Sequence, residues 1–177
     1  GIPGSLGGGV YMNAGAYGRT MEDVVAGAEV YHLESGFTNL NQEGLDLGYR
    51  TSSLQQTRGI LVEVHLQLTP GDEGVIRAEM KALNGQRREK QPLELPSAGS
   101  VFKRPVGAFA GRLIEEAGLK GKTVGQAQVS PKHAGFIVNL GGATARDVLT
   151  LIEVVQTEVE RYTGYRLEPE IRILGGE

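Results

Sequence analysis

The sequence predicts a fold that mixes helices and strands, of the α/β or α+β class. Residues 60–68 alternate apolar and polar side chains with the period of two that is typical of a strand. Residues 143–162 instead repeat apolar side chains at helical spacing. Among 177 residues, 40% are hydrophobic and 22% charged, as in soluble globular proteins. Because strands and helices are intermixed along the chain, both mixed classes remain open at this point.

Two strands and a helix are predicted in the N-terminal half. Residues 24–33 are rich in Val and Tyr, which favours a strand. In residues 60–68 every even-numbered position is apolar, which predicts one continuous apolar face. Asp72 is expected to cap a following helix. The apolar face of that helix comprises Val75, Ile76, Met80 and Leu83, and its pattern fades over residues 86–92.

The C-terminal half begins with a predicted loop over residues 92–105, which contains three prolines. A short helix follows and ends at Gly118. Its inward residues are expected to be Phe109, Leu113, Ile114 and Ala117.

Residues 135–140 are predicted to form a buried strand, and residues 143–162 form the most regular predicted helix. Gly164 marks the end of that helix. Its stripe comprises Val148, Leu151, Ile152, Val155, Val159 and Tyr162. Residues 170–174 are predicted as a last strand, with Ile171 and Ile173 on one face.

Charge and composition exclude several classes of function. The net charge is −3, whereas nucleic-acid binders usually carry a basic surplus. There is no Cys, so disulfides and thiolate chemistry are excluded, and a reducing compartment is favoured. No apolar run is long enough to predict a membrane span. His32, His65 and His133 lie far apart in the sequence, so no metal site is expected.

Glycine is unusually frequent, with 27 residues, and it gathers near the start of the chain. Glycine allows backbone conformations and close approaches that a Cβ atom forbids. The chain opens on this glycine-rich stretch without an initiator Met, so we expect it to start inside a domain. The opening glycines do not fit a dinucleotide-binding fingerprint, and Gly121-Lys122-Thr123 lacks the upstream Gly of a phosphate-binding loop.

Five stretches instead resemble one known family in their order and residues. They are Gly1–Ser5 with Asn13–Gly18, Gly48–Ser52, Ala98–Pro105, Ala127–Asn139 and Leu167–Arg172. The chain resembles the UDP-N-acetylenolpyruvoylglucosamine reductase (MurB) family, flavoenzymes of peptidoglycan precursor synthesis. The path from Tyr49 to residues 87–90 is similar to the shorter of its two structural types.

The resemblance implies an α+β fold: the second half of a two-subdomain FAD-binding fold of the PCMH type, then a small α+β substrate-binding domain. Residues 1–90 would form the second FAD subdomain, and residues 91–163 the substrate domain. Residues 164–177 would carry a C-terminal strand with a catalytic Glu. The first FAD subdomain would be missing, and we expect weakened FAD binding for that reason. The family also implies a cytoplasmic location and a monomer at full length.

The resemblance also implies the reaction and the cofactors FAD and NADPH. A hydride would pass from NADPH through FAD to the enolpyruvyl ether of UDP-N-acetylglucosamine enolpyruvate, which gives UDP-N-acetylmuramate. Arg50, Ser100 and Glu170 match the family's catalytic positions. Hydride addition builds negative charge on the substrate carboxylate, which a guanidinium such as that of Arg50 stabilises. Ser100 would protonate the adjoining carbon, and Glu170 would donate or position a proton.

Further binding residues are assigned on the same resemblance. The predicted cofactor contacts are Gly1, Ile2, Pro3, Gly4, Ser5, Gly7, Gly8, Asn13, Ala14, Gly15, Ala16, Tyr17, Arg50 and Val62. The predicted substrate contacts are Lys90, Arg104, Lys132, His133, Asn139 and Arg172. Two alternatives remain open: another flavoprotein oxidoreductase of the same fold, and a non-catalytic UDP-sugar-binding remnant.

Overall fold

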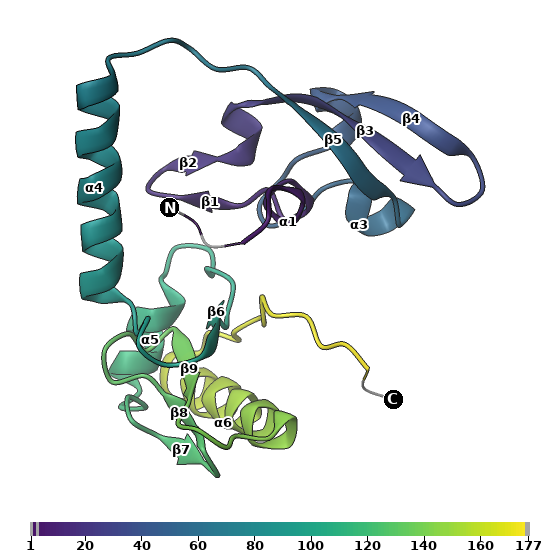
Figure 1. Cartoon of the computed structure of the whole chain (residues 1–177). Helices are drawn as coiled ribbons and strands as arrows, with labels where there is room; N and C mark the ends of the chain where they lie inside the picture. Colours follow the sequence, from purple (N-terminus) through teal and green to yellow (C-terminus); the bar gives the residue numbers. More distant parts are fainter. Residues whose placement is uncertain (1, 3, 176–177) are drawn as a thin grey trace. The chain divides into compact units, whose positions relative to one another are not determined.

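The structure is a computed structural model that describes residues 2, 4–175 of the chain. The predicted cofactor contacts Gly1 and Pro3 lie outside these described residues. The chain folds as two units, residues 1–80 and residues 81–177, which are taken in turn. Figure 1 labels the elements of both units. The structure places the boundary inside a helix, ten residues earlier than the one expected after residue 90, and the three predicted domain ranges stay predictions.

The first unit is built on a three-stranded antiparallel sheet of order β4-β3-β5. Strand β3 (Val25–His32) is central, between β4 (Gly36–Asn41) and β5 (Ile60–Leu66), so both predicted strands are confirmed. The smaller elements are α1 (Leu6–Tyr11), β1 (Gly15–Ala16), β2 (Arg19–Thr20), the 3-10 turn η1 (Met21–Asp23), α2 (Gln42–Leu45) and α3 (Leu54–Thr57). They enclose a core of Val10, Val25, Ala28, Val30, Leu45 and Leu54.

The continuous apolar face predicted for residues 60–68 is wrong. The pairing of β5 with β3 shifts where Leu61 faces Val30 and Glu63 faces Glu29, which leaves Val62 as an extra residue. Such a bulge reverses the face of every later side chain. Leu61 and Val64 pack on the core as a result. The other apolar residues of the strand, Ile60, Val62 and Leu66, are exposed.

Helix α4 (Glu73–Lys90) begins as predicted, because Asp72 Oδ1 accepts the backbone N–H of Val75 at 2.9 Å. The helix continues to Lys90, beyond the point where its apolar pattern fades. None of its residues is buried, and Val75, Ile76 and Met80 are exposed. Neither this helix nor any other in the described part of the chain is long and apolar enough to cross a membrane.

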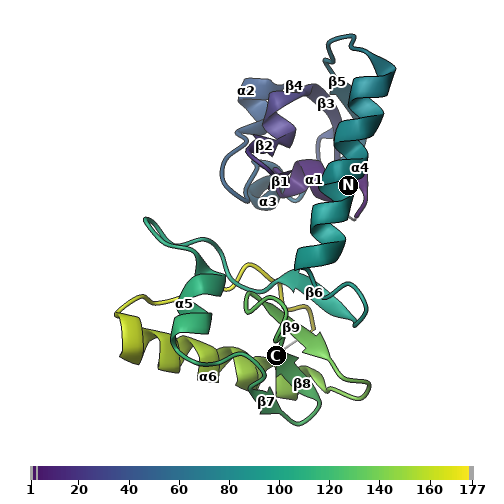
Figure 2. The same cartoon turned by 90° about the vertical axis from the view of Figure 1, so that its left-hand side faces the viewer.

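The second unit contains a four-stranded antiparallel sheet of order β6-β9-β8-β7. The strands are β6 (Ser97–Ser100), β7 (Thr123–Val124), β8 (Ala127–Val129) and β9 (Phe136–Asn139). Helix α6 (Ala145–Thr163) packs against β7, β8 and helix α5 (Ala110–Glu116), as Figure 2 shows. The predicted helices and buried strand are therefore confirmed, and Gly164 ends α6 at φ +75°. The core lies between the sheet and these helices, with Ile114, Val129 and Val155 among its members.

Other predictions for this unit are wrong. Strand β6 and the hairpin β7–β8 were not predicted, because segments of two to four residues are too short to show a clear period. Phe109 and Tyr162 were expected inside, but they are 57% and 65% exposed. Residues 170–174 form no strand, and the segment instead makes a single β-bridge between Pro169 and Phe102.

Candidate active site

Arg50 lies in a tight turn of the first unit, where Gly48 and Thr51 exchange backbone hydrogen bonds. Its φ of +57° is in the left-handed region, which is uncommon for a residue with a side chain. The guanidinium donates from Nη2 to the carbonyl oxygen of Gly15 at 3.1 Å. Its central carbon also lies 5.1 Å from the ring centre of Tyr49. The half-buried guanidinium is therefore held by both backbone and ring.

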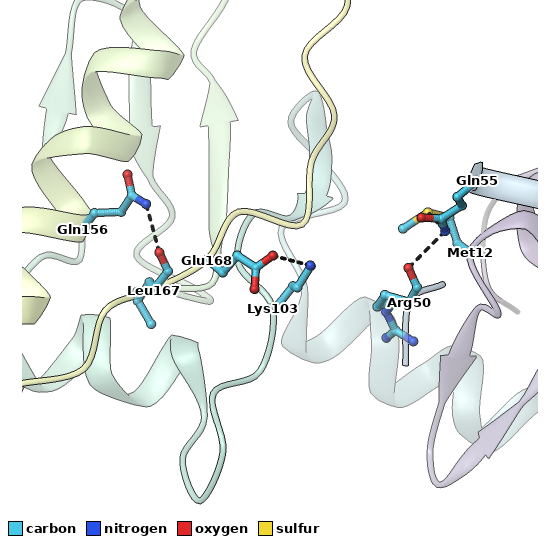
Figure 3. Close-up of polar contacts among 7 residues, drawn as sticks. All are labelled: Met12, Arg50, Gln55, Lys103, Gln156, Leu167 and Glu168. Atoms are coloured by element: carbon cyan, nitrogen blue, oxygen red, sulfur yellow. Dashed lines mark hydrogen bonds and ion pairs between the residues drawn. The ribbon is translucent and has the colours of Figure 1, made fainter. Parts of the chain in front are cut away.

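Two polar side chains that the sequence analysis did not single out fix the backbone around Arg50. Gln55 Nε2 donates to the carbonyl oxygen of Arg50 at 3.1 Å, as drawn in Figure 3, and to that of Tyr11 at 2.8 Å. Ser52 is buried and donates from Oγ to the same Tyr11 oxygen at 2.8 Å. The turn that carries Arg50 is thus tied to the end of α1 and the segment that follows it. The only sequence signal for Ser52 was its place in the Gly-Tyr-Arg-Thr-Ser stretch.

Asn13, a predicted cofactor contact, connects two loops of this unit through side-chain hydrogen bonds. Its side chain is buried and its φ is +40°. Oδ1 accepts the backbone N–H of Glu22 at 3.0 Å, and Nδ2 donates to the carbonyl oxygen of Gly48 at 2.9 Å. These bonds join the glycine-rich region to the turn of Arg50. The role of Asn13 in cofactor binding stays a prediction.

Several of the predicted cofactor contacts use their backbone groups within the fold. The N–H groups of Gly8, Asn13 and Ala14 donate to Ser5 Oγ, Val10 O and Gly9 O at 3.1, 3.0 and 2.7 Å. A Cβ atom on Gly15 would lie 2.8 Å from Arg19 O, so this glycine is required by the β1–β2 hairpin. Nothing lies within 4 Å of a Cβ atom placed on Gly4, whose φ is +137°.

The predicted cofactor contacts nonetheless have the chemical properties that a flavin site requires. Ile2, Tyr17 and Val62 of the predicted set expose apolar or aromatic surface, as a large aromatic ring system requires. Gly4 leaves room for a ligand to approach the backbone, whereas a Cβ atom on Gly7 would lie 3.8 Å from Leu61 Cδ2. Arg50 supplies a fixed positive charge in the same unit. Ala16, which precedes Tyr17 in the sequence and lies in β1, is half-buried.

Ser100 ends strand β6 in the second unit, at a register position opposite Phe136 of β9. Its Oγ donates to the carbonyl oxygen of Phe102 at 3.3 Å. The next residue, Val101, donates its N–H to the carbonyl oxygen of Gly135 at 2.9 Å. Ser100 is exposed, and the backbone around it is held on the β9 side.

Glu170, in the C-terminal segment, lies on a segment that pairs with the residues directly after Ser100. Its N–H donates to the carbonyl oxygen of Val101 at 2.7 Å, and Lys103 N–H donates to Glu168 O at 2.8 Å. The side chains of Lys103 and Glu168 also form an ion pair, which Figure 3 shows. Gln156 of α6 adds a bond from Nε2 to the carbonyl oxygen of Leu167 at 2.9 Å. Ser100 and Glu170, which are 70 positions apart, therefore lie on paired segments.

The predicted substrate residues of the second unit have varied surroundings. Lys132 Nζ donates to the carbonyl oxygen of Arg88 at 2.9 Å and lies 3.5 Å from Glu94 Oε2. The guanidinium of Arg104 lies over the ring of Phe109, 3.9 Å from its centre. Lys90, in the last turn of α4, and Arg172 are exposed.

Asn139 has a structural role that the sequence analysis did not predict. Its Oδ1 accepts the N–H groups of Gly141, Gly142 and Ala143 at 2.8, 2.9 and 3.0 Å. His133 is half-buried near Ser100, and burial lowers its pKa below the ordinary value. Among the described residues, no group of His, Asp or Glu side chains could hold a metal ion.

Comparison with known proteins places these observations in a family. Residues 91–174 match the family model described as UDP-N-acetylenolpyruvoylglucosamine reductase, C-terminal domain. Over its full 177 residues, the chain is 54% identical to the UDP-N-acetylenolpyruvoylglucosamine reductases of Pediococcus pentosaceus and Levilactobacillus brevis. It covers 59% and 58% of those two proteins.

The chain belongs to the UDP-N-acetylenolpyruvoylglucosamine reductase family.

A solved structure of this family agrees with the fold. The reductase (MurB) of Thermus caldophilus superposes with a TM-score of 0.85 at 41% sequence identity, over 97% of this chain and 61% of that chain. The family resemblance and the predicted α+β fold class are thus confirmed. The chain spans less than two thirds of the length of each of these family members.

Proposed function

We propose that the chain is the part of an NADPH- and FAD-dependent reductase that carries its catalytic side chains. The substrate is UDP-N-acetylglucosamine enolpyruvate and the product is UDP-N-acetylmuramate, a precursor of peptidoglycan, made in the cytoplasm. The observation that carries the proposal is the pairing of residues 101–103, which directly follow Ser100, with residues 168–170. It places a hydroxyl and a carboxylate on adjoining segments in a family whose named reaction needs proton delivery to carbon.

The reaction requires a positive charge next to the substrate carboxylate. When bound, FAD supplies the hydride. The described residues that would hold it are Ile2, Gly4, Ser5, Gly7, Gly8, Asn13, Ala14, Gly15, Ala16, Tyr17, Arg50 and Val62. Addition of hydride to the enolpyruvyl double bond moves negative charge onto the carboxylate. The guanidinium of Arg50 is always ionised and donates to the carbonyl oxygen of Gly15, while Gln55 holds the backbone carbonyl of Arg50. Arg50 stabilises this charge at little cost in reorganisation.

The carbon next to the carboxylate must then receive a proton. Ser100 Oγ is exposed and hydrogen-bonded only weakly to Phe102 O at 3.3 Å, so it is able to turn toward a substrate. Glu170 on the neighbouring segment donates or positions the proton. The phosphates of the UDP-sugar need cations, which Lys90, Arg104 and Lys132 provide. His133, Asn139 and Arg172 complete the proposed substrate contacts.

The test uses the protein expressed from its complete gene. NADPH oxidation is followed at saturating cofactor with and without UDP-N-acetylglucosamine enolpyruvate. The proposal predicts oxidation that depends on this substrate, above a slow reaction with oxygen. Ser100→Ala removes the activity, whereas Ser97→Ala, an exposed serine on the same strand, keeps it. Equal NADPH oxidation without the substrate contradicts the proposal.

A second candidate is UDP-sugar binding without catalysis. It is favoured because the second unit has a hydrophobic core of its own. This unit also contains Ser100, Arg104 and Lys132. The absorbance spectrum of the protein expressed from its complete gene distinguishes the two. A flavin spectrum supports the reductase, and a colourless protein that still binds UDP supports the second candidate.

A further inference from the structure

The imidazole of His133 lies against two glycines, one in α5 and one in the turn that precedes β9. A Cβ atom on Gly111, in the first turn of α5, would lie 3.3 Å from His133 Cε1. A Cβ atom on Gly135 would lie 3.0 Å from Cε1 and 3.1 Å from Nδ1 of the same ring. All three distances are shorter than ordinary van der Waals contact, so the ring occupies space that only glycine leaves open. Phe136 closes the niche with its ring centre 5.0 Å from that of His133, edge to face.

The protonation state of this imidazole follows from one hydrogen bond. The N–H of Gly135 donates to Nδ1 of His133 at 3.1 Å, which requires that Nδ1 carry no proton. The ring is therefore neutral with its hydrogen on Nε2. Burial lowers the pKa of His133, in agreement with a neutral ring.

The same Gly135 supports the strand that carries Ser100. The carbonyl oxygen of Gly135 accepts the N–H of Val101 at 2.9 Å. The Cβ position of Gly135 that faces His133 also lies 3.6 Å from Ser100 Oγ. The turn that begins at His133 is closed by the bond from Phe136 N–H to His133 O at 3.0 Å. The peptide unit of Gly135 thus connects the imidazole to the backbone beside the hydroxyl.

We propose that His133 is a positioning residue for Ser100, which acts through the Gly135 peptide and only in its neutral form. The hydrogen bond to Nδ1 fixes the turn of residues 133–136, and this turn fixes the end of β6. Protonation of Nδ1 removes the acceptor and replaces it with a donor that faces an N–H group. The effect of His133 on catalysis rests on the proposed function of Ser100. The coupling between the protonation state of His133 and the backbone at Val101 does not rest on it.

The charges that act on His133 come from Glu115 of α5 and Lys120 of the following turn. They pair with each other at 2.6 Å, Lys120 Nζ to Glu115 Oε1, and push the pKa of His133 in opposite directions. From β9, the uncharged ring of Phe136 packs against His133, and the uncharged Ser100 of β6 lies near the same Cβ position of Gly135. The hydrogen bond is therefore retained at neutral pH and lost as the pH falls through the lowered pKa of His133.

The coupling is tested by NMR on the 177-residue chain. Long-range proton–nitrogen spectra of the wild-type chain are expected to show His133 as the Nε2–H tautomer at pH 7. Amide exchange at Gly135 and Val101, corrected for the intrinsic rate, is expected to accelerate as His133 is protonated. His133→Ala accelerates both by about fivefold, the factor for one neutral hydrogen bond. In His133→Asn, a side-chain oxygen accepts the N–H two residues ahead, which keeps the protection and removes its pH dependence.

Activity of the protein from its complete gene gives the second readout. His133→Ala slows the substrate half-reaction but not flavin reduction by NADPH, and His133→Asn restores it at pH 7. His65→Asn, at an exposed histidine of the first unit, changes neither. An Nδ1–H tautomer in the wild-type chain overturns the proposal, and so does unchanged exchange at Gly135 and Val101 in His133→Ala. Confirmed coupling in a protein without reductase activity contradicts the proposed function alone.

Discussion

The backbone N–H of Glu170 donates to the carbonyl oxygen of Val101 at 2.7 Å. This bond joins the last described segment of the chain to the residue that follows Ser100. The N–H of Val101 donates to Gly135 O, so Val101 is hydrogen-bonded both to the residue before β9 and to the C-terminal segment. The relative placement of Ser100 and Glu170 therefore depends on how firmly residues 167–170 are anchored to the second unit.

Gln156→Ala is expected to loosen that anchor. The substitution removes the bond from Nε2 to the carbonyl oxygen of Leu167, whose side chain is buried. The free energy of unfolding should fall by about 1 kcal/mol. Amide exchange at residues 168–170 should accelerate more than in the core of α6. Glu153→Ala, an exposed position one turn earlier on α6, is the matched control and should change neither quantity.

Asn13→Ala is expected to destabilise the first unit by about 1–3 kcal/mol, since it leaves Glu22 N–H without its partner and removes one of the two bonds that Gly48 O accepts. Asn13→Asp should be destabilising too, because a carboxylate cannot donate to Gly48 O and faces the carboxylate of Glu22. Urea denaturation measures both. Asn39→Ala, at an exposed position of β4, should leave stability nearly unchanged. An Asn13→Ala chain as stable as the wild type would show that these bonds contribute nothing.

The N-terminus of α6 is expected to give an acid-dependent contribution to stability. The backbone N–H of Thr144 donates to Asp147 at 2.9 Å and holds the pKa of Asp147 below its ordinary value of 3.8. A carboxylate with a lowered pKa stabilises the fold above 3.8, and this contribution is lost as the pH falls through the folded-state pKa. Thermal unfolding of wild type and Asp147→Asn should differ at pH 7. The two curves should converge with acid, and a difference that is constant with pH contradicts the assignment.

Phe109→Ala is expected to weaken binding of UDP to the chain. The guanidinium of Arg104 lies over the ring of Phe109, 3.9 Å from its centre, and loss of the ring removes a contact that restricts this side chain. Such ordering is worth about 0.5–1.5 kcal/mol, which corresponds to a rise in Kd of roughly two- to tenfold. Calorimetric titration with UDP measures the affinity. Tyr162→Ala, at another exposed aromatic, is the control, and equal affinities of the Phe109 variant and wild type would show that the ring does not position Arg104 for UDP.

The fold was predictable where one periodicity covers many residues. The stripe from Val148 to Val159 and the stop at Gly164 determine α6, because a long amphipathic pattern has few alternatives. Strand β6 could not be predicted, since Ser-Ala-Gly-Ser has neither alternation nor strand propensity and pairs only through its backbone. Residues 170–174 alternate like a strand, yet the segment meets its partner only at the Phe102–Pro169 bridge.

The site divides in a similar way. Arg50, Ser100 and Glu170 could be predicted as catalytic residues because each lies in a short motif that resembles the family's, and their roles stay predictions. Gln55 and Gln156 were missed because each acts on a carbonyl oxygen 44 or 11 positions away, and such a bond leaves no local pattern. The surroundings of His133 could not be predicted either, since Gly111 and Gly135 are far apart in the sequence and come together only in the folded chain.

The central claim is that Ser100 delivers a proton to the substrate, and stopped-flow measurement of the two half-reactions in Ser100→Ala tests it most directly. The protein is expressed from its complete gene and loaded with FAD. Reduction of the flavin by NADPH requires no protonation of carbon, so the account predicts a nearly unchanged rate for this step. Reoxidation by UDP-N-acetylglucosamine enolpyruvate should slow by about 10²–10⁴-fold, the range of general acid catalysis. Equal slowing of both steps, or an unchanged rate of reoxidation, would contradict the claim.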